Sequence, residues 1–567
     1  MFSQKLFYFH SFVNSFCVFC TFCGSNNTIF TRLIFYKKAV YVDKTKMIHN
    51  IINTANLYFL SRPRRFGKSL LVATLKEIFQ GNKEIFQDLW IGQQTDYTFE
   101  SFPVLHFNFA DYGHKVENIE EILNHEVSKY AQQFGIELNE KSLGNRFKAL
   151  VKNIAKKGKP VVLLIDEYDK PMVDFITEVD KAKANRKVLR SFFSPLKGLD
   201  LEGHLKFLFI TGISKFSKVS LFSDLNNLTD LSKSPLANDL LGITQKELED
   251  NFQDYIKRMA ENMNLPENEL LKHIKQWYNG YSYDGKITLY NPFSLLNFFT
   301  HFQFDNYWFE TGTPTFLVEI IQENYVNPRE LEYIEVDNYF FNSFILEKID
   351  VIGLLYQTGY LTIKEATYSV YGSSYVLGYP NIEVRQSMIY NLTQAYTYKS
   401  KTVVSSAMVK MRRGLHQGKM DIFIEQLKII LSDISYHLHP PSSRGRLKDR
   451  KKAKNEAELF IPSTREWEGY FQTVIYLVTA YLELTVSSEV TKHKGRLDLV
   501  AETENFIYLM EFKLDGTATN AIEQIKNREY AAAYKNASKQ VVLVGVNFSK
   551  EERNVESFEV EVWEQKH

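Results

Sequence analysis

Two residues near the C-terminus, Glu511 and Lys513, have types and a spacing that could serve the hydrolysis of a phosphodiester bond. They stand two apart in the run 506–513, whose apolar residues alternate with a period of two and predict a β-strand. Side chains two apart in a strand project from the same face, so the carboxylate and the ammonium should converge. A carboxylate at that spot can hold a divalent cation, and an ammonium can hold the attacking water or the phosphate.

A third ionisable residue, Asp498, is expected at the same spot. The run 497–502 predicts the preceding strand, and the short link 503–505 would fold the two strands back antiparallel, bringing Asp498 beside Glu511. Two carboxylates at close range repel each other unless a cation lies between them, and oxygen ligands suit Mg²⁺ or Mn²⁺. We therefore predict Asp498 and Glu511 as metal ligands and, with Lys513, as catalytic residues of a metal-dependent nuclease.

The pattern of these three residues resembles the D…(D/E)xK signature of the PD-(D/E)XK nuclease superfamily. The string alone also fits a solvated hairpin face that carries a Glu/Lys pair. The surrounding elements favour the nuclease, because they follow the order of the superfamily's α-β-β-β-α core.

The helix predicted at 467–484 precedes the hairpin and carries Glu468, and the helix predicted after the hairpin carries Gln524 and Tyr530. The apolar run 541–546 then supplies the next buried strand. The resemblance implies that Glu468 and Gln524 also belong to the catalytic site.

A second candidate site lies at 58–71, YFLSRPRRFGKSLL, where a short apolar strand and a basic loop precede an amphipathic helix that opens with Gly67-Lys68-Ser69. Backbone N–H groups at the start of that helix, together with the positive end of its dipole, would bind phosphate. Lys68 would reach the β- and γ-phosphates of a nucleotide, and the Ser69 hydroxyl would ligate Mg²⁺. We predict Gly67, Lys68 and Ser69 as nucleotide-binding residues, with Ser69 also a metal ligand.

This loop departs from the G-x-x-x-x-G-K-[ST] template, because Arg62 stands where the template has its first glycine and Pro63 stiffens the chain after it. The first turn of the loop must therefore be built differently. Arg64 and Arg65 either compensate by contacting phosphate or are solvated loop charges, and both interpretations stay open. They are candidate nucleotide-binding residues.

The run 161–165 is unbroken Val, Leu and Ile and is followed by Asp166 and Glu167, which is typical of a central parallel strand that ends in acids. Ligands bind at the carboxyl ends of strands in open α/β sheets. Asp166 would hold Mg²⁺ and Glu167 would polarise the hydrolytic water, as in a Walker B element. The run 207–210 predicts another buried strand, and Thr211 at its end either senses the nucleotide or simply ends the strand.

Together these motifs resemble, nearly end to end, the bacterial AAA-ATPase-like proteins that carry a C-terminal PD-(D/E)XK nuclease domain. The resemblance is carried by YVDKT at 41–45, SRPRRFGKS at 61–69, IDEYDKP at 165–171, TGISKFSKVSLFSDLNNLTDLS from 211, YNPFSLLNFF from 290, YWFETGTPTFL from 307, LLYQTGYLTIK from 354, EFKLDG from 511 and QIK from 524. Arg62 is the usual residue of this family at its position. The resemblance implies action on nucleic acid that depends on ATP and Mg²⁺, and it does not imply a biological role.

We therefore expect an α/β multidomain chain with a P-loop ATPase built on a parallel sheet, a helical lid, a winged-helix-like middle and a C-terminal α/β restriction-endonuclease-like nuclease domain. The expected boundaries are 1–36 for an atypical N-terminal segment, 37–240 for the AAA-like ATPase domain, 241–347 for the lid, 348–440 for a winged-helix-like and helical connector, 441–456 for a basic linker and 457–567 for the nuclease-like domain. Aromatic clusters such as 277–278 and 307–309 fit core packing of the lid. The winged-helix-like segment would either contact DNA or couple domains.

The composition fits a cytoplasmic chain of several domains, with 567 residues, 44% hydrophobic and 24% charged residues and a net charge of +1. Such a small net charge gives no overall basic field, so local patches must hold a nucleic acid. The run 442–454, SSRGRLKDRKKAK, has seven Lys or Arg against one Asp and either binds phosphate or acts as a solubilising tether.

The three cysteines, Cys17, Cys20 and Cys23, have the spacing C-x₂-C-x₂-C but lack a fourth ligand, so a metal site there is not expected. The apolar run at 1–28 is too broken for a membrane span, and a misassigned start would explain this atypical segment.

We expect ATP and Mg²⁺ (or Mn²⁺) as cofactors and a nucleic acid as partner, DNA in preference to RNA, without a membrane partner; homo-oligomerisation is left open. The leading hypothesis is an ATP-regulated nuclease. The alternatives are a nucleotide-switched scaffold whose nuclease fold is an inactive binding module, and an ATPase without a C-terminal activity.

Overall fold

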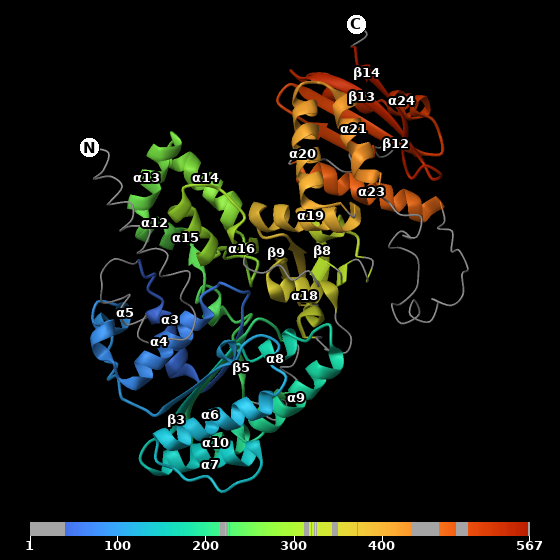
Figure 1. The fold of residues 1–567 in the computed structure, drawn as a ribbon. Coiled ribbons are helices and arrows are strands. Elements are labelled where there is room, and N and C mark those ends of the chain that lie inside the picture. The colour runs from blue at the N-terminus through green and yellow to red at the C-terminus, as the bar shows by residue number, and fades with distance from the viewer. Residues whose placement is uncertain are drawn as a thin grey trace, which may run out of the picture. The chain divides into compact units, whose positions relative to one another are not determined.

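The computed structural model of the 567-residue chain describes a defined set of residues, and Figure 1 shows their arrangement. They are 40–215, 221–222, 225, 227–310, 317–318, 320–321, 324, 326–342, 350–370, 372–397, 399–432, 464–482 and 497–564. Our predictions for the N-terminal segment with its cysteines and for the basic run 442–454 lie outside the described residues. Among these residues, no helix combines the length and the apolar character needed to cross a bilayer.

The chain divides into two compact units. Unit 1 comprises Met1–Thr313 and Tyr333–Val384, and unit 2 comprises Pro314–Glu332 and Arg385–His567. The segment expected as one connector, 348–440, is thus shared between the units.

Unit 1 is built on a five-stranded sheet of order β2-β3-β4-β1-β5, in which all neighbouring strands are parallel. Its strands are β1 (Leu57–Ser61), β2 (Val104–Asn108), β3 (Val161–Asp166), β4 (Leu205–Gly212) and β5 (Thr229–Asp230). The predicted parallel sheet is confirmed. Because the strands are parallel, the carboxyl ends of β1, β3 and β4 lie along one edge, and β4 separates the strand before the basic loop from the strand that ends in Asp166.

Helices cover both faces of this sheet, which explains why β1 and β3 are buried on both sides. One face packs on α3 (Thr45–Thr54) and α4 (Lys68–Gln80) through residues such as Tyr58, Val162 and Phe207. The other face packs on α6 (Ile119–Gln133), α7 (Leu143–Lys156) and α9 (Val179–Phe193) through residues such as Phe59 and Leu163. The alternation of side chains along each strand divides the core into these two clusters.

The predicted helical lid follows the sheet in the sequence and has its own aromatic core. Its helices are α12 (Gln245–Asn251), α13 (Gln253–Met263), α14 (Glu267–Tyr278), α15 (Pro292–His301) and α16 (Tyr307–Glu310). Tyr278 is fully buried, and Trp308 is only 6% exposed. The interpretation as core is therefore confirmed for Tyr278, Tyr307 and Trp308, whereas the side chain of Phe309 is outside the described atoms.

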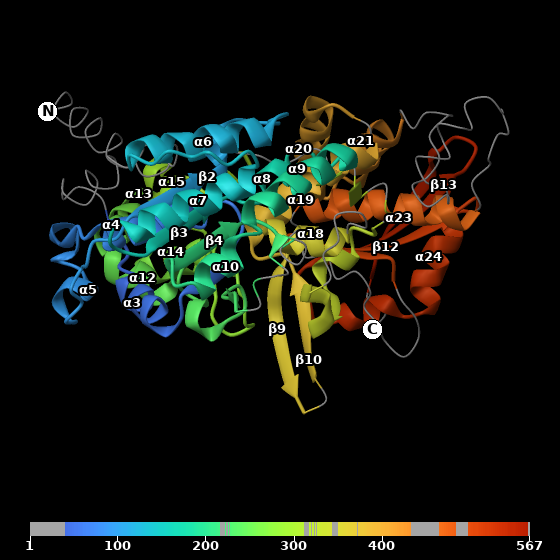
Figure 2. The same ribbon diagram turned by 90° about the horizontal axis from the view of Figure 1, so that it is seen from below.

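Unit 1 also contains a winged-helix-like element, an antiparallel sheet of order β8-β10-β9 in which α18 (Val351–Thr358) follows the first strand in the sequence and precedes the other two. The strands are β8 (Ile334–Asp337), β9 (Thr362–Ser369) and β10 (Gly372–Gly378), and Figure 2 shows the long β9–β10 hairpin. Most side chains of α18 are buried or half-buried, including Leu354 and Leu355. The helix therefore packs inside unit 1.

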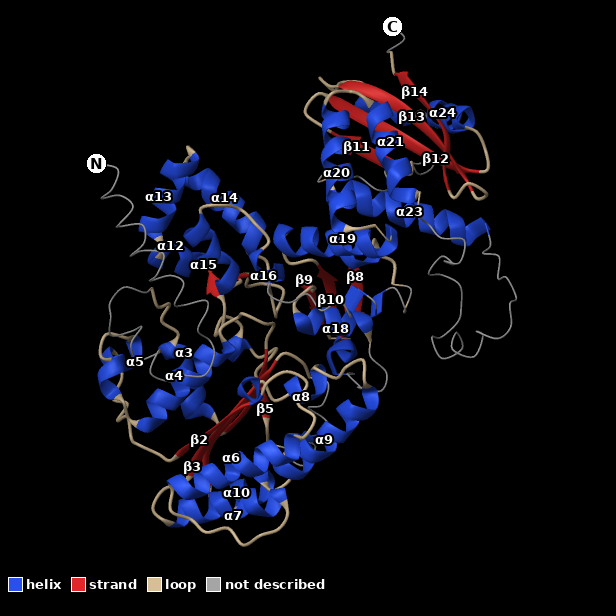
Figure 3. Cartoon of the chain, in the orientation of Figure 1, coloured by secondary structure: helices blue, strands red, loops and turns tan. Residues whose placement is uncertain are grey.

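Unit 2 contains a four-stranded mixed sheet of order β11-β12-β13-β14, which Figure 3 shows in red. Its strands are β11 (Leu499–Glu502), β12 (Phe506–Leu514), β13 (Gln540–Ser549) and β14 (Asn554–Val562). The antiparallel β11–β12 hairpin and the buried strand after it are confirmed, whereas β14 was not predicted.

Helices α20 (Lys401–His416), α21 (Met420–Leu431), α23 (Thr464–Tyr481) and α24 (Ala518–Asn527) pack on this sheet. Helix α19 (Ile382–Thr397), whose first residues belong to unit 1, contacts α23, where the Tyr470 hydroxyl donates to the Tyr396 carbonyl at 2.7 Å. Gln524 lies on α24 as predicted. Tyr530 does not: α24 ends at Asn527, and Tyr530 begins a separate 3-10 turn, Tyr530–Tyr534, because Glu529 adopts a left-handed backbone with φ of 53° and ends the helical path.

Candidate nucleotide-binding and nuclease sites

The hairpin β11–β12 brings Asp498 beside Glu511, as the sequence predicts. Leu499 pairs with Met510, so Asp498 at the entrance of β11 lies opposite the next residue of β12. The backbone N–H of Phe512 donates a 2.8 Å hydrogen bond to Asp498 Oδ2. This bond fixes the Asp498 carboxylate at the edge of β12.

Glu511 forms the centre of a compact polar cluster. Its Oε1 atom lies 3.4 Å from Lys513 Nζ and accepts a hydrogen bond from Gln524 Nε2. Lys513 Nζ also donates to Gln524 Oε1 at 2.5 Å. The structure therefore brings three predicted site residues together, and they share one carboxylate oxygen.

The second oxygen of Glu511 is suited to a cation. Glu511 is only 3% exposed, and its Oε2 atom has no hydrogen-bond partner among the described residues. Burial, together with the negative charge of Asp498, raises the pKa of Glu511 to about 7. An orphaned buried carboxylate oxygen beside a second carboxylate fits a divalent cation, which would favour the ionised form.

A cation at this position would need further ligands. Within the described ranges no three His, Cys, Asp or Glu side chains form a metal-ligating group. Asp498 and Glu511 would therefore share the ion with backbone carbonyls, water or a phosphate, which suits Mg²⁺ because it usually keeps several waters.

A glycine that sequence reasoning missed allows Gln524 to reach Glu511. Gly545 on β13 is the register partner of Glu511, and a Cβ atom there would lie 2.2 Å from the carbonyl oxygen of Ala518 at the start of α24. Helix α24 can approach the sheet so closely only because this side chain is absent. The signal in the sequence is a lone glycine within the β-branched run 541–546.

Tyr530 also lies near the two carboxylates. It is 7% exposed, and its hydroxyl has no hydrogen-bond partner among the described residues. Burial, and next the charge of Glu511, raise the pKa of Tyr530. Its hydroxyl is therefore a neutral donor in this cluster at physiological pH.

Glu468 lies on α23 as predicted, but the position of its side chain is outside the described atoms. Helix α23 packs through Phe471, whose ring stacks on Phe548 of β13 at 4.8 Å. Phe548 pairs with Leu514 and hence faces away from the side that carries Glu511. The catalytic role of Glu468 stays a prediction.

In unit 1, the basic loop between β1 and α4 has the backbone of a phosphate-binding turn. Left-handed conformations occur at Arg65, with φ of 66°, and at Gly67, with φ of 94°, which is the N-cap of α4. Lys68 is 6% exposed, and its Nζ donates to the carbonyl oxygens of Arg62 and Pro63 at 3.0 and 2.9 Å. The ammonium that is predicted to bind the β- and γ-phosphates therefore donates to these two carbonyls in this structure.

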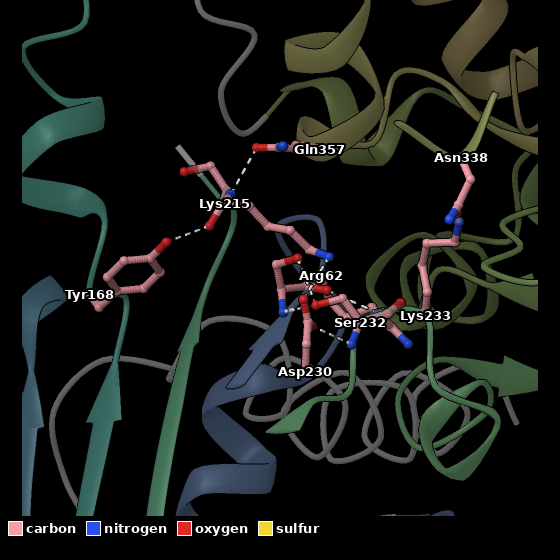
Figure 4. Close-up of polar contacts among 10 residues, drawn as sticks. Arg62, Tyr168, Lys215, Asp230, Ser232, Lys233, Asn338 and Gln357 are labelled. Atoms are coloured by element: carbon pink, nitrogen blue, oxygen red, sulfur yellow. Dashed lines mark hydrogen bonds and ion pairs between the residues drawn. The ribbon is translucent and has the colours of Figure 1, made fainter. Parts of the chain in front are cut away.

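Arg62 explains how the loop forms without the first glycine of the template. Its guanidinium is buried and donates to the carbonyl oxygens of Ser61, Ser232 and Ala237 at 2.8 to 3.0 Å. It also lies 3.5 Å from the ring centre of Tyr283. The side chain therefore points out of the loop into the body of unit 1, and Figure 4 shows it beside Asp230 and Ser232.

Asp166 at the end of β3 faces Ser69 at the start of α4. Asp166 is 1% exposed, accepts a hydrogen bond from the Ser69 side chain, and has no partner for Oδ1 among the described residues. Burial raises the pKa of Asp166 to about 6, and the charge of Glu167 adds to the rise. This pair fits Mg²⁺ as the sequence predicts. Glu167 follows with a left-handed backbone, φ of 52°.

The structure also identifies Asp169, which sequence reasoning overlooked. Its buried carboxylate accepts hydrogen bonds from the backbone N–H groups of Ile213 and Ser214 and from the Ser214 hydroxyl, at 2.6 to 3.1 Å for Oδ2. It thereby joins the acidic end of β3 to the loop that follows β4. The sequence feature that could have indicated this residue is the second Asp of the motif IDEYDKP.

Three other predicted residues have defined places. The Thr211 hydroxyl is buried and donates to the Leu60 carbonyl at 2.8 Å, which links β4 to β1. Arg64 and Arg65 are both exposed, and the Arg65 guanidinium lies 4.8 Å from the ring centre of Phe293 in the lid. Their roles toward a nucleotide stay predictions.

A cavity of about 140 Å³ opens beside the loop. It is bordered by Gly67 and Leu70 of the loop and α4, by residues 40–42, and by Leu241 and Phe293. Most of its lining is apolar, which suits the flat face of a base. This cavity could not be predicted from the sequence, because its walls come from separate segments.

Comparison with known proteins identifies two domains in the chain. The chain matches a model described as a predicted AAA-ATPase over residues 28–222 and a PD-(D/E)XK nuclease superfamily model over residues 466–558. An uncharacterized protein in the vnfD 5' region of Azotobacter chroococcum mcd 1 is 33% identical over 528 residues, which cover 92% of this chain and 95% of that protein. The chain belongs to the AAA-ATPase-like family with a C-terminal PD-(D/E)XK nuclease domain.

Among solved structures, this AAA-ATPase-like protein is compared with the Aeropyrum pernix ORC1 protein in complex with DNA. The match covers 61% of this chain and 91% of that chain, with 10% identity and a TM-score of 0.24.

One family motif of the AAA-ATPase-like protein, YVDKT at 41–45, has a structural role near the cavity. Asp43 accepts hydrogen bonds from the backbone and hydroxyl of Thr45 and from the Trp90 N–H, at 2.7 to 2.8 Å, and so fixes the start of α3. Lys44 pairs with Glu247 of the lid at 2.6 Å. The motif at 41–45 therefore attaches the segment before α3 to α12.

Proposed function

We propose that this AAA-ATPase-like protein is an ATP-regulated, Mg²⁺-dependent nuclease that hydrolyses phosphodiester bonds of DNA. The observation that carries the proposal is the Glu511 carboxylate, which is buried with one oxygen held by Lys513 and Gln524 and the other without a partner beside Asp498. A divalent cation bound there would supply an acidified water and neutralise charge on the scissile phosphate.

The residues of the chain would divide the remaining tasks. Asp498, held by the Phe512 N–H, and Glu511 would bind the cation. Gln524 would fix the orientation of Glu511, and Lys513 would hold the attacking water or a phosphate oxygen as a charged donor.

We infer that the site in unit 1 binds ATP with Mg²⁺. Ser69 and Asp166 would hold the cation, the amides at Gly67 and the start of α4 would hold phosphates, and the apolar cavity beside them would take the adenine. Two of the three N–H groups of Lys68 Nζ donate to the carbonyl oxygens of Arg62 and Pro63, and a phosphate that draws the ammonium toward it would release these carbonyls.

That release supports regulation, because the start of the loop contacts the lid and the winged-helix-like element. Pro63 packs so closely on Gly359, the C-cap of α18, that a Cβ atom there would lie 2.6 Å from Pro63 Cβ. The Trp308 indole N–H donates to the Arg64 carbonyl at 3.3 Å. A change in the loop would therefore reach both elements.

A second connection starts from the loop after β4. Asp169 fixes Ser214, the next residue Lys215 pairs with Asp230 at 2.9 Å, and the Lys215 N–H donates to Gln357 of α18 at 2.9 Å (Figure 4). The acidic end of β3 is thus linked to α18 through consecutive hydrogen bonds. We propose that α18 couples domains and does not read DNA.

The deciding experiment measures cleavage of linear, circular and single-stranded DNA and of RNA with Mg²⁺ or Mn²⁺, with and without ATP. Lys513→Ala should lose cleavage and retain ATP binding, whereas Lys68→Ala should lose ATP binding and any ATP effect. Lys550→Ala is the matched control, because Lys550 is a half-buried lysine of the same unit that pairs with Asp515. Cleavage that survives in Lys513→Ala would overturn the assignment of the site.

A second candidate function is a nucleotide-switched scaffold whose nuclease fold only binds. It is favoured by the small number of acidic ligands, because no third acidic, His or Cys side chain joins Asp498 and Glu511 within the described part of the chain. Nucleic-acid and metal binding without cleavage under all of these conditions would select it.

A further inference from the structure

The region that leads into the nuclease sheet contains an unusual run of positive charge. Residues 384–420, 37 in all, include seven Lys or Arg and no Asp or Glu, in a chain whose net charge is only +1. The seven cations are Arg385, Lys399, Lys401, Lys410, Arg412, Arg413 and Lys419. A segment with seven cations and no acidic residue produces a local positive field, although the net charge of the whole chain is close to zero.

Helix α20 concentrates this charge on a solvent-facing surface. Its apolar face, including Val404, Met408 and Met411, is buried. The opposite side exposes Lys410, Arg412 and Arg413 and, one to three turns earlier, the hydroxyl side chains Thr402, Ser405 and Ser406. We call these six residues the α20 basic face.

The cations of the α20 basic face are not neutralised within the described residues. Lys410, Arg412 and Arg413 form no ion pair there, although many other exposed lysines of the chain do, such as Lys526 with Glu561 at 2.6 Å. Because no ion pair neutralises them within the described part of unit 2, these groups are available to an anionic partner.

The end of α20 is held firmly against the nuclease sheet. The Tyr508 hydroxyl of β12 donates to the Leu415 carbonyl at 2.7 Å. Gly418, between α20 and α21, has φ of 71° and would place a Cβ atom 2.7 Å from the Phe506 ring. Strand β12, which carries Glu511 and Lys513, thus also anchors the end of α20 where the charge is densest.

We propose that the α20 basic face binds the phosphate backbone of the nucleic acid on which the nuclease site acts, outside the catalytic centre; this rests on the proposed nuclease function. Lys and Arg with neighbouring Ser and Thr hydroxyls are the groups that contact phosphates without reading sequence. The partner is therefore a polyanion with regularly spaced phosphates, and the contact sets the position and affinity of the substrate.

The test measures binding of a fluorescein-labelled 30-base-pair duplex of mixed sequence to the full chain in EDTA, so that cleavage cannot occur. The triple variant Lys410→Ser, Arg412→Ser, Arg413→Ser should weaken binding at least tenfold at about 100 mM salt. A plot of the logarithm of the association constant against the logarithm of the salt concentration has a negative slope. The triple variant should reduce the magnitude of this slope by about 2 to 3, because each lost phosphate contact contributes about 0.9. The charge-preserving variant Lys410→Arg, Arg412→Lys, Arg413→Lys should bind within about twofold of the wild type.

The matched control removes the same charge elsewhere, through Lys257→Ser, Lys272→Ser and Lys275→Ser on the exposed surface of the lid. It should leave both affinity and slope unchanged. Equal losses in the two triple variants would overturn the proposal, because they would reflect net charge alone.

A second readout separates this proposal from the proposed nuclease function. With Mg²⁺ and saturating DNA, the α20 triple variant should retain the wild-type cleavage rate and raise only the DNA concentration needed for half-maximal rate. Cleavage with unchanged binding in the variant would overturn the role of α20 and leave the nuclease intact. Loss of binding to phosphatidylserine vesicles, with DNA binding unchanged, would overturn it in favour of an anionic membrane surface.

Discussion

Protonation of Glu511 should set the lower pH limit of cleavage. The pKa of this residue is about 7, raised by burial and by Asp498, and only the ionised carboxylate can ligand a cation. We expect the single-turnover rate with Mg²⁺ to rise about tenfold per pH unit below 7 and to level off above it. Mn²⁺, which nitrogen and oxygen ligands bind more tightly than Mg²⁺, should shift the rise to lower pH. A flat profile from pH 5.5 to 8 would contradict this role.

The same residue should destabilise the metal-free protein at alkaline pH. The folded-state pKa lies above the ordinary value of 4.5, so the favourable contribution is complete below pH 4.5 and is lost as pH rises through about 7. Glu511→Gln should therefore raise the free energy of unfolding in EDTA by about 1–3 kcal/mol at pH 8 and have little effect at pH 4.5. Urea unfolding at the two pH values measures this, and Glu523→Gln, an exposed neighbour on α24, should be neutral at both.

Arg62 should resist replacement by the glycine of the standard P-loop. Arg62→Gly leaves three buried carbonyl oxygens without their donor and should destabilise unit 1 by about 2–4 kcal/mol while weakening ATP binding. Arg64→Gly, at an exposed position two residues on, isolates the effect of added loop freedom. Thermal unfolding with and without ATP compares the two variants, and equal midpoints would show that the Arg62 hydrogen bonds contribute nothing.

At the scale of single residues, local spacing predicted the positions of side chains whose partners lie near their own strand. It did not predict the contacts of side chains whose partners are distant in the sequence. The two-residue spacing of Glu511 and Lys513 sufficed to place them on one face. The role of Arg62 could not be predicted, because two of its acceptors lie 170 and 175 residues away. No local pattern encodes such a contact.

Among the elements, α24 depends most strongly on a single residue. Gly545→Ala should push α24 away from β13, separate Gln524 from Glu511, and reduce cleavage by at least tenfold while ATP binding persists. Gly469→Ala on α23 is the control, because a Cβ atom there meets nothing within 4 Å and should stabilise the helix slightly. Full cleavage by Gly545→Ala would show that α24 does not position the site.

Elements with one buried face were predictable, whereas the outer strand β14 was not. Val555 is its only fully buried residue, and Glu556, Glu559 and Glu561 interrupt its apolar side chains. The sequence of this edge strand is therefore typical of an exposed segment. A winged-helix-like element was expected within 348–440, but only the structure shows that its helix is buried within unit 1.

Across the whole molecule, the contact between Pro63 and Gly359 should transmit the nucleotide state to α18. We expect a non-hydrolysable ATP analogue to change amide hydrogen exchange at 350–361 in the wild type. Gly359→Ala should retain nucleotide binding and lose this response, because its Cβ atom would collide with Pro63.

Gly372→Ala is the matched control for that experiment. Gly372 also has a left-handed backbone, with φ of 128°, but a Cβ atom there meets nothing within 4 Å. It therefore reproduces the backbone strain without the collision. An unaltered response in Gly359→Ala, or an equal loss in Gly372→Ala, would refute transmission through this contact.

The distribution of charge over the whole chain was harder to interpret from sequence than either site. The run 442–454 is conspicuous because its cations are adjacent, whereas those of 384–420 are separated by apolar residues. Only the helical winding of α20 shows that Lys410, Arg412 and Arg413 lie together on an exposed surface.

The hydrogen bonds of Arg62 also have a consequence for the history of the family. Its acceptors at 232 and 237 are backbone carbonyls, which every amino acid provides. Mutations at Ala237 can therefore accumulate without loss of this contact, whereas no other side chain can replace the guanidinium fork. Among diverging descendants, Arg62 should persist without a covarying partner, so methods that infer proximity from correlated substitutions would not detect one of the firmest long-range contacts of unit 1.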